Sequence, residues 1–199
     1  MLELINATKR FGDFTVLDSL CLKFPEKGVV ALLGPSGSGK TTLLRVAAGL
    51  EMLSAGEVRK HPDAKISMVF QEDRLIPWLS ARENILAVLP PGRESQEKTA
   101  RLLRDCLLSD AVHLPPDKLS GGMQRRVAIA RALAFGGNLL LLDEPFKGLD
   151  AQTREDVVRV TLDANKGGLT LLVTHDPGEA ERCADVILRF DGPPLRLID

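Results

Sequence analysis

A glycine-rich stretch, "GPSGSGKTT" at residues 34–42, constrains the fold of this chain more than any other feature. It fits the spacing G-x-x-x-x-G-K-[ST] through Gly34, Gly39, Lys40 and Thr41, between the apolar run "VVALL" and a helical pattern. Glycines let successive backbone N–H groups turn toward phosphate, and the helix start adds positive potential. An accidental glycine–serine turn is disfavoured, because the stretch links a predicted strand to a predicted helix.

The whole loop is therefore a candidate nucleotide-phosphate site. We expect Lys40 to reach the β- and γ-phosphate oxygens and Thr41 to coordinate Mg²⁺. The predicted contacts are Gly34, Pro35, Ser36, Gly37, Ser38, Gly39, Lys40, Thr41 and Thr42.

The segment "LLLLDEP" at residues 139–145 is predicted to be a buried strand that ends in two carboxylates. Adjacent residues at a strand end point in different directions, so Asp143 and Glu144 can have different roles. We expect Asp143 to hold Mg²⁺ through water and Glu144 to act as general base toward the attacking water. The alternative is that both acids simply form a turn, which the neighbouring phosphate loop makes less favourable.

Two further polar residues follow apolar strands. "LLVTHD" places His175 at a strand end, where it is predicted to contact the γ-phosphate or the attacking water. Gln71 follows "KISMVF" and is a candidate contact to Mg²⁺ or water. A lone histidine is usually structural or exposed, and Gln71 by itself would be unremarkable.

A second glycine-rich stretch, "KLSGGMQRR", begins another predicted helix. Ser120 is a good N-cap, and Gly121 and Gly122 leave unshielded N–H groups at the helix start, which is an anion site. The alternative is that the glycines only separate this helix from the proline-rich segment before it.

The order of predicted elements indicates an α/β fold. Residues 2–33 contain β-like runs that suggest an antiparallel start, and residues 40–49 have helical spacing. After residue 119 the pattern alternates between helices and buried strands, which predicts a mainly parallel sheet with crossover helices. Asp176 is predicted to cap the helix that starts at Pro177.

Residues 72–118 differ from the rest, because they carry five prolines and no convincing strand. Ser80 and Glu83 form a predicted capping box for the helix "ARENILAVL", and "SQEKTARLLRDCLL" predicts a second helix. We therefore expect a single domain over residues 1–199, with a core of 1–71 and 119–199 and a small helical insertion at 72–118.

The composition disfavours several classes of protein. A formal net charge of −1 gives no basic surface typical of nucleic-acid binding, so no nucleic-acid partner is expected. Three widely spaced cysteines suggest neither a disulfide framework nor a metal site. The N-terminus lacks the apolar region of a signal peptide, and no apolar run approaches the roughly 20 residues of a membrane span.

Taken together, these motifs resemble those of the ATP-binding subunits of ABC transporters. The phosphate loop, Gln71, "LSGGMQ", "LLLLDEP", "GLD" and His175 occur in that family's order over essentially the entire chain. The resemblance implies a P-loop NTPase fold with an N-terminal antiparallel β subdomain, and ATP and Mg²⁺ as ligands. It also implies that two copies pair head to tail, with each ATP between the phosphate loop of one copy and Ser120, Gly121, Gly122 and Gln124 of the other.

The same resemblance assigns further roles. Phe11 would stack on adenine where the family often has tyrosine, and Asp150 would lie in a loop that crosses between the copies. Gln71 would link Mg²⁺ to the helical insertion, where such subunits receive a membrane partner. Trp78 is either a contact anchor for that partner or part of the packing of the insertion, and the sequence leaves both open.

The function that this resemblance implies is ATP hydrolysis coupled to transport of a small solute. "VFQEDRLIPWLSARENI" resembles importers of nitrate, sulfonate and taurine, which suggests uptake. The implied partners are polytopic membrane permease subunits and an extracytoplasmic solute-binding protein, and the implied location is the cytoplasmic face of the membrane. The alternative is a soluble ABC-type ATPase of an assembly or repair machine. A regulatory GTPase is disfavoured because "NKGG" at residue 165 lacks the aspartate of a guanine-reading motif.

Overall fold

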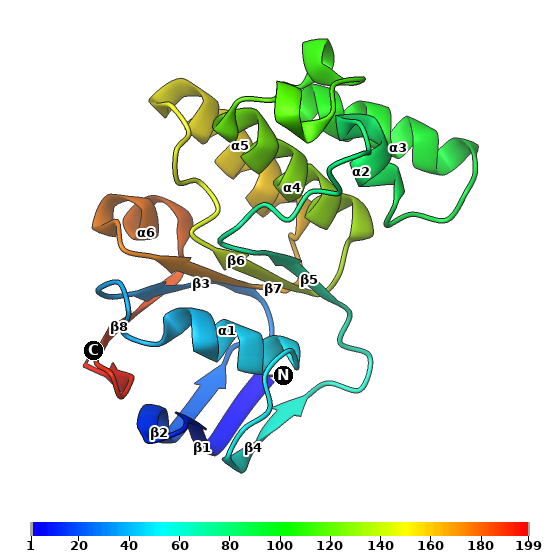
Figure 1. Cartoon of the computed structure of the whole chain (residues 1–199). Coiled ribbons are helices and arrows are strands. Elements are labelled where there is room, and N and C mark those ends of the chain that lie inside the picture. Colours follow the sequence, from blue (N-terminus) through cyan, green and yellow to red (C-terminus); the bar gives the residue numbers. More distant parts are fainter. Residues whose placement is uncertain (1, 199) are drawn as a thin grey trace.

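The apolar runs of the sequence form one six-stranded sheet (Figure 1). The computed structural model describes residues 2–198. The strand order is β5-β6-β7-β3-β8-β9, and every neighbouring pair is parallel except β8 and β9. The strands are β3 (Gly28–Leu33), β5 (Ile66–Val69), β6 (Leu139–Asp143), β7 (Leu169–Thr174), β8 (Val186–Asp191) and β9 (Arg196–Leu197). The predicted parallel sheet is confirmed.

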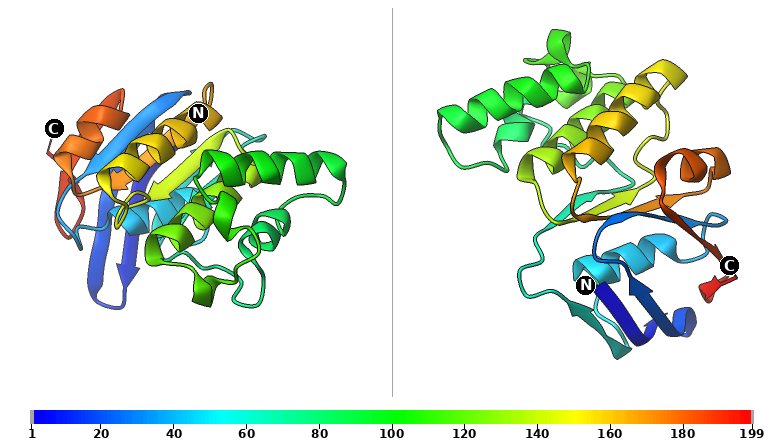
Figure 2. Two further views of the ribbon diagram at one scale, coloured as in Figure 1. Left: turned by 90° about the horizontal axis from the view of Figure 1, so that it is seen from above. Right: turned by 180° about the vertical axis from the view of Figure 1, so that it is seen from behind.

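Helices cover both faces of this sheet (Figures 1 and 2). One face carries α1 (Lys40–Ala48), and the other carries α4 (Gly121–Phe135), α5 (Ala151–Ala164) and α6 (Pro177–Cys183). The sequence of strand β6 is uniformly apolar because both faces of the strand are buried. Leu141 packs in the cluster on the α1 side, and Leu142 packs in the cluster on the α4 side. Burying each leucine contributes about 1.5–3 kcal/mol.

A second, antiparallel sheet lies beyond α1 (Figure 2). It has the order β2-β1-β4 and consists of β1 (Leu2–Phe11), β2 (Phe14–Phe24) and β4 (Ala55–Lys60). Its buried residues share one cluster with α1 and the central sheet. The expected N-terminal antiparallel β subdomain is confirmed, and it closes the α1 side of the phosphate loop.

The helical lobe lies on the α4 side (Figure 1). It contains α2 (Ala81–Leu86), α3 (Arg93–Asp105) and the 3₁₀ turns η1 (Ser109–Ala111) and η2 (Pro116–Lys118). The capping box is present: Ser80 Oγ accepts from Glu83 N at 3.3 Å, and the Glu83 carboxylate accepts from Ser80 N at 2.8 Å. Within residues 2–198, no helix has the length and apolar character required to cross a bilayer.

Two predicted helix boundaries in this lobe are wrong. The first helix ends at Leu86, before the expected "AVL", and Pro90 and Pro91 follow shortly after it. The second helix ends at Asp105, because the backbone turns at Leu107, whose φ of 56° is incompatible with an α-helix. The remaining helices after residue 119 begin and end within a residue or two of the predicted positions.

Candidate functional site

The phosphate loop connects β3 to α1, and two of its glycines are required by their surroundings. A Cβ at Gly34 would lie 2.4 Å from the backbone oxygen of Phe190. Gly39 has a φ of +111°, and a Cβ there would lie 2.8 Å from Val16 Cγ1. Any other residue at these positions would displace the strands that frame the loop. The glycine spacing therefore serves close packing as well as approach to an anion.

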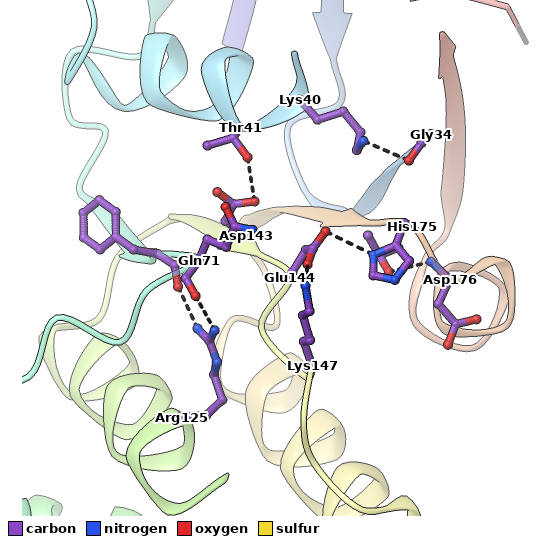
Figure 3. Close-up of polar contacts among 12 residues, drawn as sticks. Gly34, Lys40, Thr41, Gln71, Arg125, Asp143, Glu144, Lys147, His175 and Asp176 are labelled. Carbon is purple, nitrogen blue, oxygen red and sulfur yellow. Dashed lines mark hydrogen bonds and ion pairs between the residues drawn. The ribbon is translucent and has the colours of Figure 1, made fainter. Parts of the chain in front are cut away.

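Lys40 is buried at the start of α1 and lies inside the loop (Figure 3). Its Nζ donates to Gly34 O at 2.9 Å, Pro35 O at 2.6 Å and Ser38 Oγ at 3.1 Å. Burial lowers the pKa of the Lys40 ammonium, although nearby carboxylates oppose the shift. A cation held only by neutral oxygens in a buried loop is well suited to an anionic ligand.

Thr41 and Asp143 meet across the gap between α1 and β6. Thr41 Oγ1 donates to Asp143 Oδ1 at 3.1 Å (Figure 3). Burial raises the pKa of Asp143 above its usual value, and the hydrogen bond from Thr41 only partly offsets this. Hard oxygen donors with an uncompensated carboxylate fit Mg²⁺. Within residues 2–198 no group of three or more His, Cys, Asp or Glu side chains is placed to hold a metal ion.

Glu144 follows β6 in a left-handed backbone conformation with a φ of 47°. Its Oε1 lies 3.0 Å from His175 Nδ1, and its Oε2 accepts from Lys147 Nζ at 3.0 Å (Figure 3). Burial would raise the pKa of this carboxyl, but the hydrogen bonds from Lys147 and His175 outweigh it and hold the pKa below its usual value. Glu144 is therefore ionised at neutral pH, as a general base must be.

The meeting of Glu144 and His175 follows from the sheet register. Strands β6 and β7 are parallel neighbours, with Asp143 paired to Val173, and Glu144 N donates to Val173 O at 3.0 Å. The residues that follow both strands must then lie at the same sheet edge. Lys147 is a site residue that the sequence reasoning missed, although its position three residues after Glu144 was a usable signal.

Gln71 lies at the same edge, because β5 pairs with β6 in parallel and Val69 is opposite Leu142. Its backbone oxygen accepts a hydrogen bond from Arg125 of α4 (Figure 3). The side chain is exposed to solvent. The contact with Arg125 was not predicted, since 54 residues separate the partners in the sequence.

The second glycine-rich stretch begins α4 as predicted. Ser120 Oγ accepts from Met123 N at 3.3 Å, and an added Cβ at Gly121 would meet nothing within 4 Å. The helix start is thus open to a ligand. It lies on the sheet face opposite α1, and so apart from the phosphate loop of the same chain (Figure 2). Gln124 has a role that the sequence did not reveal, because its amide donates to Pro116 O at 2.9 Å and Leu119 O at 3.1 Å.

Three other predicted residues lie outside this cluster. Phe11 is 47% exposed, with Lys9 Nζ 4.6 Å from its ring centroid. Asp150 caps α5 by accepting from Thr153 N at 3.0 Å, and this hydrogen bond lowers its pKa. Trp78 is 80% exposed, so the alternative in which it packs within the helical lobe is wrong.

The sequence matches the family model described as "ABC transporter" over residues 17–147. It is 41% identical to the aliphatic sulfonates import ATP-binding protein SsuB 1 of Pseudomonas aeruginosa, with 98% of this chain and 83% of the relative covered. It is 40% identical to the glutamine transport ATP-binding protein GlnQ of Escherichia coli, with 96% and 88% covered.

Solved structures agree with these matches. A dimeric bacterial ABC transporter cassette superposes with a TM-score of 0.85 at 32% identity, covering 95% of this chain and 94% of the other. A dimeric ATP-binding cassette in a post-hydrolysis state, bound to ADP and phosphate, superposes with a TM-score of 0.84 at the same identity and coverage.

The buried carboxylate of Asp143 leads to a prediction about stability. Asp143→Asn is expected to raise the thermal midpoint at pH 7 without divalent ions. The substitution removes a negative charge that burial makes unfavourable, and it keeps an oxygen that can accept from Thr41. Each kcal/mol gained corresponds to about 2–4 °C in a chain of this size. Thermal unfolding followed by circular dichroism in EDTA measures this.

The sign of the pH dependence follows from the raised pKa of Asp143. The native state holds this proton more tightly than the unfolded chain, so the parent loses stability as pH rises from about 4 through the folded pKa. The difference in thermal midpoint between Asp143→Asn and the parent should grow as pH rises through that range, and it should vanish at lower pH. The exposed Asp13→Asn is the control, and a lower midpoint for Asp143→Asn at pH 7 would contradict the prediction.

Proposed function

The chain belongs to the ABC transporter family, and on that premise we propose that ATP binding and hydrolysis at the site described above power uptake of a small solute through membrane permease subunits. As a member of this family the chain is an ATPase that works as a dimer with such permeases.

One observation carries the proposal for hydrolysis. The ionised Glu144 contacts both His175 and Lys147 at the sheet edge where β3 runs into the phosphate loop. A base, a residue that orients it and a phosphate-binding loop thus lie together, which is the arrangement that attack by water on a terminal phosphate requires.

In the proposed reaction Lys40 exchanges its loop carbonyls for the β- and γ-phosphate oxygens of ATP. Glu144 accepts a proton from the attacking water as the water oxygen bonds to the γ-phosphorus and the bond to the leaving ADP oxygen breaks. His175 keeps the Glu144 carboxylate in place and lies within reach of the γ-phosphate. Mg²⁺, when bound, neutralises phosphate charge, and Thr41, Asp143 and Gln71 would hold it directly or through water.

Glu144→Gln tests the assignment of the base. The amide keeps the shape of the side chain but cannot accept a proton, so kcat should fall by about 10²–10⁴-fold. Binding of a fluorescent ATP analogue should stay within about twofold of the parent, because no phosphate-binding group changes. Steady-state ATPase assays and fluorescence titration measure the two quantities. Glu155→Gln, at an exposed position of α5, is the control, and a normal kcat for Glu144→Gln would refute the assignment.

We propose that each ATP site is completed by a second copy of the chain. The first N–H groups of α4, those of Gly121 and Gly122, have no carbonyl of a preceding helical turn to bond, and the space beside Gly121 is open. Yet this helix start lies on the sheet face opposite α1. A partner in head-to-tail arrangement would bring Ser120 and these N–H groups to the γ-phosphate. Asp150 would lie at the same interface, and the exposed ring of Phe11 would stack on adenine.

Mixing two inactive variants tests the shared sites. Lys40→Ala disables the phosphate loop and Ser120→Arg blocks the start of α4, so each variant alone should lose most of its ATPase activity. In an equal mixture about half of the dimers contain one variant of each kind, and each of those has one intact site. The mixture should recover up to about a quarter of the parent rate, measured by phosphate release. A rate no higher than the variants show alone would exclude shared sites that work independently of each other.

The transport assignment extends to partners and solute. Relatives are named for aliphatic sulfonates, glutamine and sulfate, so we propose a small polar solute that an extracytoplasmic binding protein delivers. The chain would lie at the cytoplasmic face of the membrane, with its helical lobe against the permease. The exposed indole of Trp78 supports a contact there.

Co-purification separates transport from the alternative of a soluble assembly or repair ATPase. A tagged chain isolated from detergent-solubilised membranes should retain a polytopic membrane protein, identified by mass spectrometry. Trp78→Ala should weaken that association by about tenfold or more without changing the ATPase activity of the isolated chain. Retention of a soluble scaffold protein alone would favour the assembly machine.

A further inference from the structure

A buried arginine of α4 holds the segment that carries Gln71. Arg125 Nη2 donates to Gln71 O (Figure 3), its Nη1 donates to Phe70 O at 2.7 Å, and its Nε lies 3.1 Å from Asp73 Oδ1. Arg125 therefore makes two hydrogen bonds and one ion pair to residues 70–73, and the Asp73 contact lacks the geometry of a hydrogen bond. No other side chain of α4 makes as many polar contacts to this segment among residues 2–198.

These contacts form in a buried setting, which makes them strong and specific. The side chain of Arg125 is 9% exposed and that of Asp73 is 20% exposed. Burial raises the pKa of the Asp73 carboxyl, and the charges of Arg125 and Arg131 oppose that shift. A planar guanidinium can reach two carbonyls and a carboxylate at once, whereas the single ammonium group of lysine cannot match that geometry.

Arg125 belongs to the same helix as Ser120–Gly122, the residues proposed to contact the nucleotide bound to the other copy. Ser120 and Arg125 are five residues apart, which is about 7.5 Å along an α-helix. The residues after Arg125 pack into the core, with Val127, Ile129 and Ala130 fully buried. The start of α4 and Arg125 belong to one continuous helix, Gly121–Phe135, which keeps them at a fixed spacing.

We propose that Arg125 is a positioning residue, which makes the position of Gln71 depend on the position of Ser120–Gly122. One chain contributes to two nucleotide sites, through its phosphate loop and Gln71 to one and through Ser120–Gly122 to the other, and Arg125 couples these two contributions. Gln71 serves the nucleotide in the chain's own phosphate loop, whereas the start of α4 serves the nucleotide of the other copy. When α4 shifts to engage the partner's nucleotide, the guanidinium carries the backbone of Gln71 with it. This inference rests on the proposed function.

Arg125→Met tests the proposal, and Arg126→Met is its control. Arg126 is the next residue of α4 and also donates to backbone carbonyls, those of Cys106 and Leu107 in the helical lobe and that of Gly122 in its own helix, but its contacts do not include residues 70–73. In the purified parent we expect ATP hydrolysis with a Hill coefficient above 1, because two copies close around two nucleotides. Arg125→Met should lower kcat about tenfold and bring the Hill coefficient to about 1. Arg126→Met should retain the cooperativity and at least about half of the parent kcat.

A double variant distinguishes positioning from a general structural defect. If Arg125 acts through Gln71, then Arg125→Met should lower kcat less than about twofold in a Gln71→Ala background, although it lowers the parent about tenfold. Affinity for a fluorescent ATP analogue should be unchanged in each single variant. Multiplied losses in the double variant, or unchanged kcat and Hill coefficient in folded Arg125→Met, would overturn the inference.

Other outcomes are also decisive. If Arg125→Met does not fold, Arg125→Lys and Asp73→Asn replace it, and each should reduce kcat and the Hill coefficient in the same direction by smaller factors. Parental values in both would overturn the inference. A parent that does not hydrolyse ATP would refute the proposed function, and this inference with it. A parent that hydrolyses ATP cooperatively, with variants that do so equally well, would refute the coupling alone.

Discussion

The parallel pairing of β3, β6 and β7 is the constraint on which the rest of the site depends. Leu33 is opposite Thr174 and Asp143 is opposite Val173, so the three strands end at one sheet edge. The phosphate loop, the carboxylates and the histidine then come together at that edge, where Thr41 bonds Asp143 and His175 contacts Glu144. The positions of these polar groups therefore depend on residues away from the site, namely the buried leucines that keep the strands in register.

The charges at this edge are balanced against one another before any ligand arrives. Lys40 is held by loop oxygens, Glu144 by Lys147 and His175, and Asp143 by Thr41, with the charges of Arg45 and Lys40 nearby, yet burial still raises the pKa of Asp143. Asp143 is therefore the least compensated group, and Glu144 is kept ionised. Such pre-positioned charges need little rearrangement when phosphate and a cation enter, which is the usual source of electrostatic catalysis.

Much of this could be predicted from sequence, because the motif residues report local geometry. Gly34, Gly39 and Ser120 are dictated by loops and caps, and the apolar runs reveal the buried strands. The roles of Lys147, Gln124 and Arg125 could not be predicted, since they depend on which backbone atoms the fold brings near. The exposure of Trp78 and the early end of the first lobe helix were likewise decided by tertiary packing and not by local pattern.

The placement of α1 and α4 on opposite faces of one sheet has a kinetic consequence. If each catalytic site is completed by a second copy, as proposed above, free chains must meet their partners in a second-order step, and turnover per chain falls on dilution. A scaffold that tethers two copies side by side replaces that step with an effective local concentration, commonly in the millimolar range for short flexible links. Because hydrolysis would then be fast only on such a scaffold, unassembled subunits would hydrolyse little ATP.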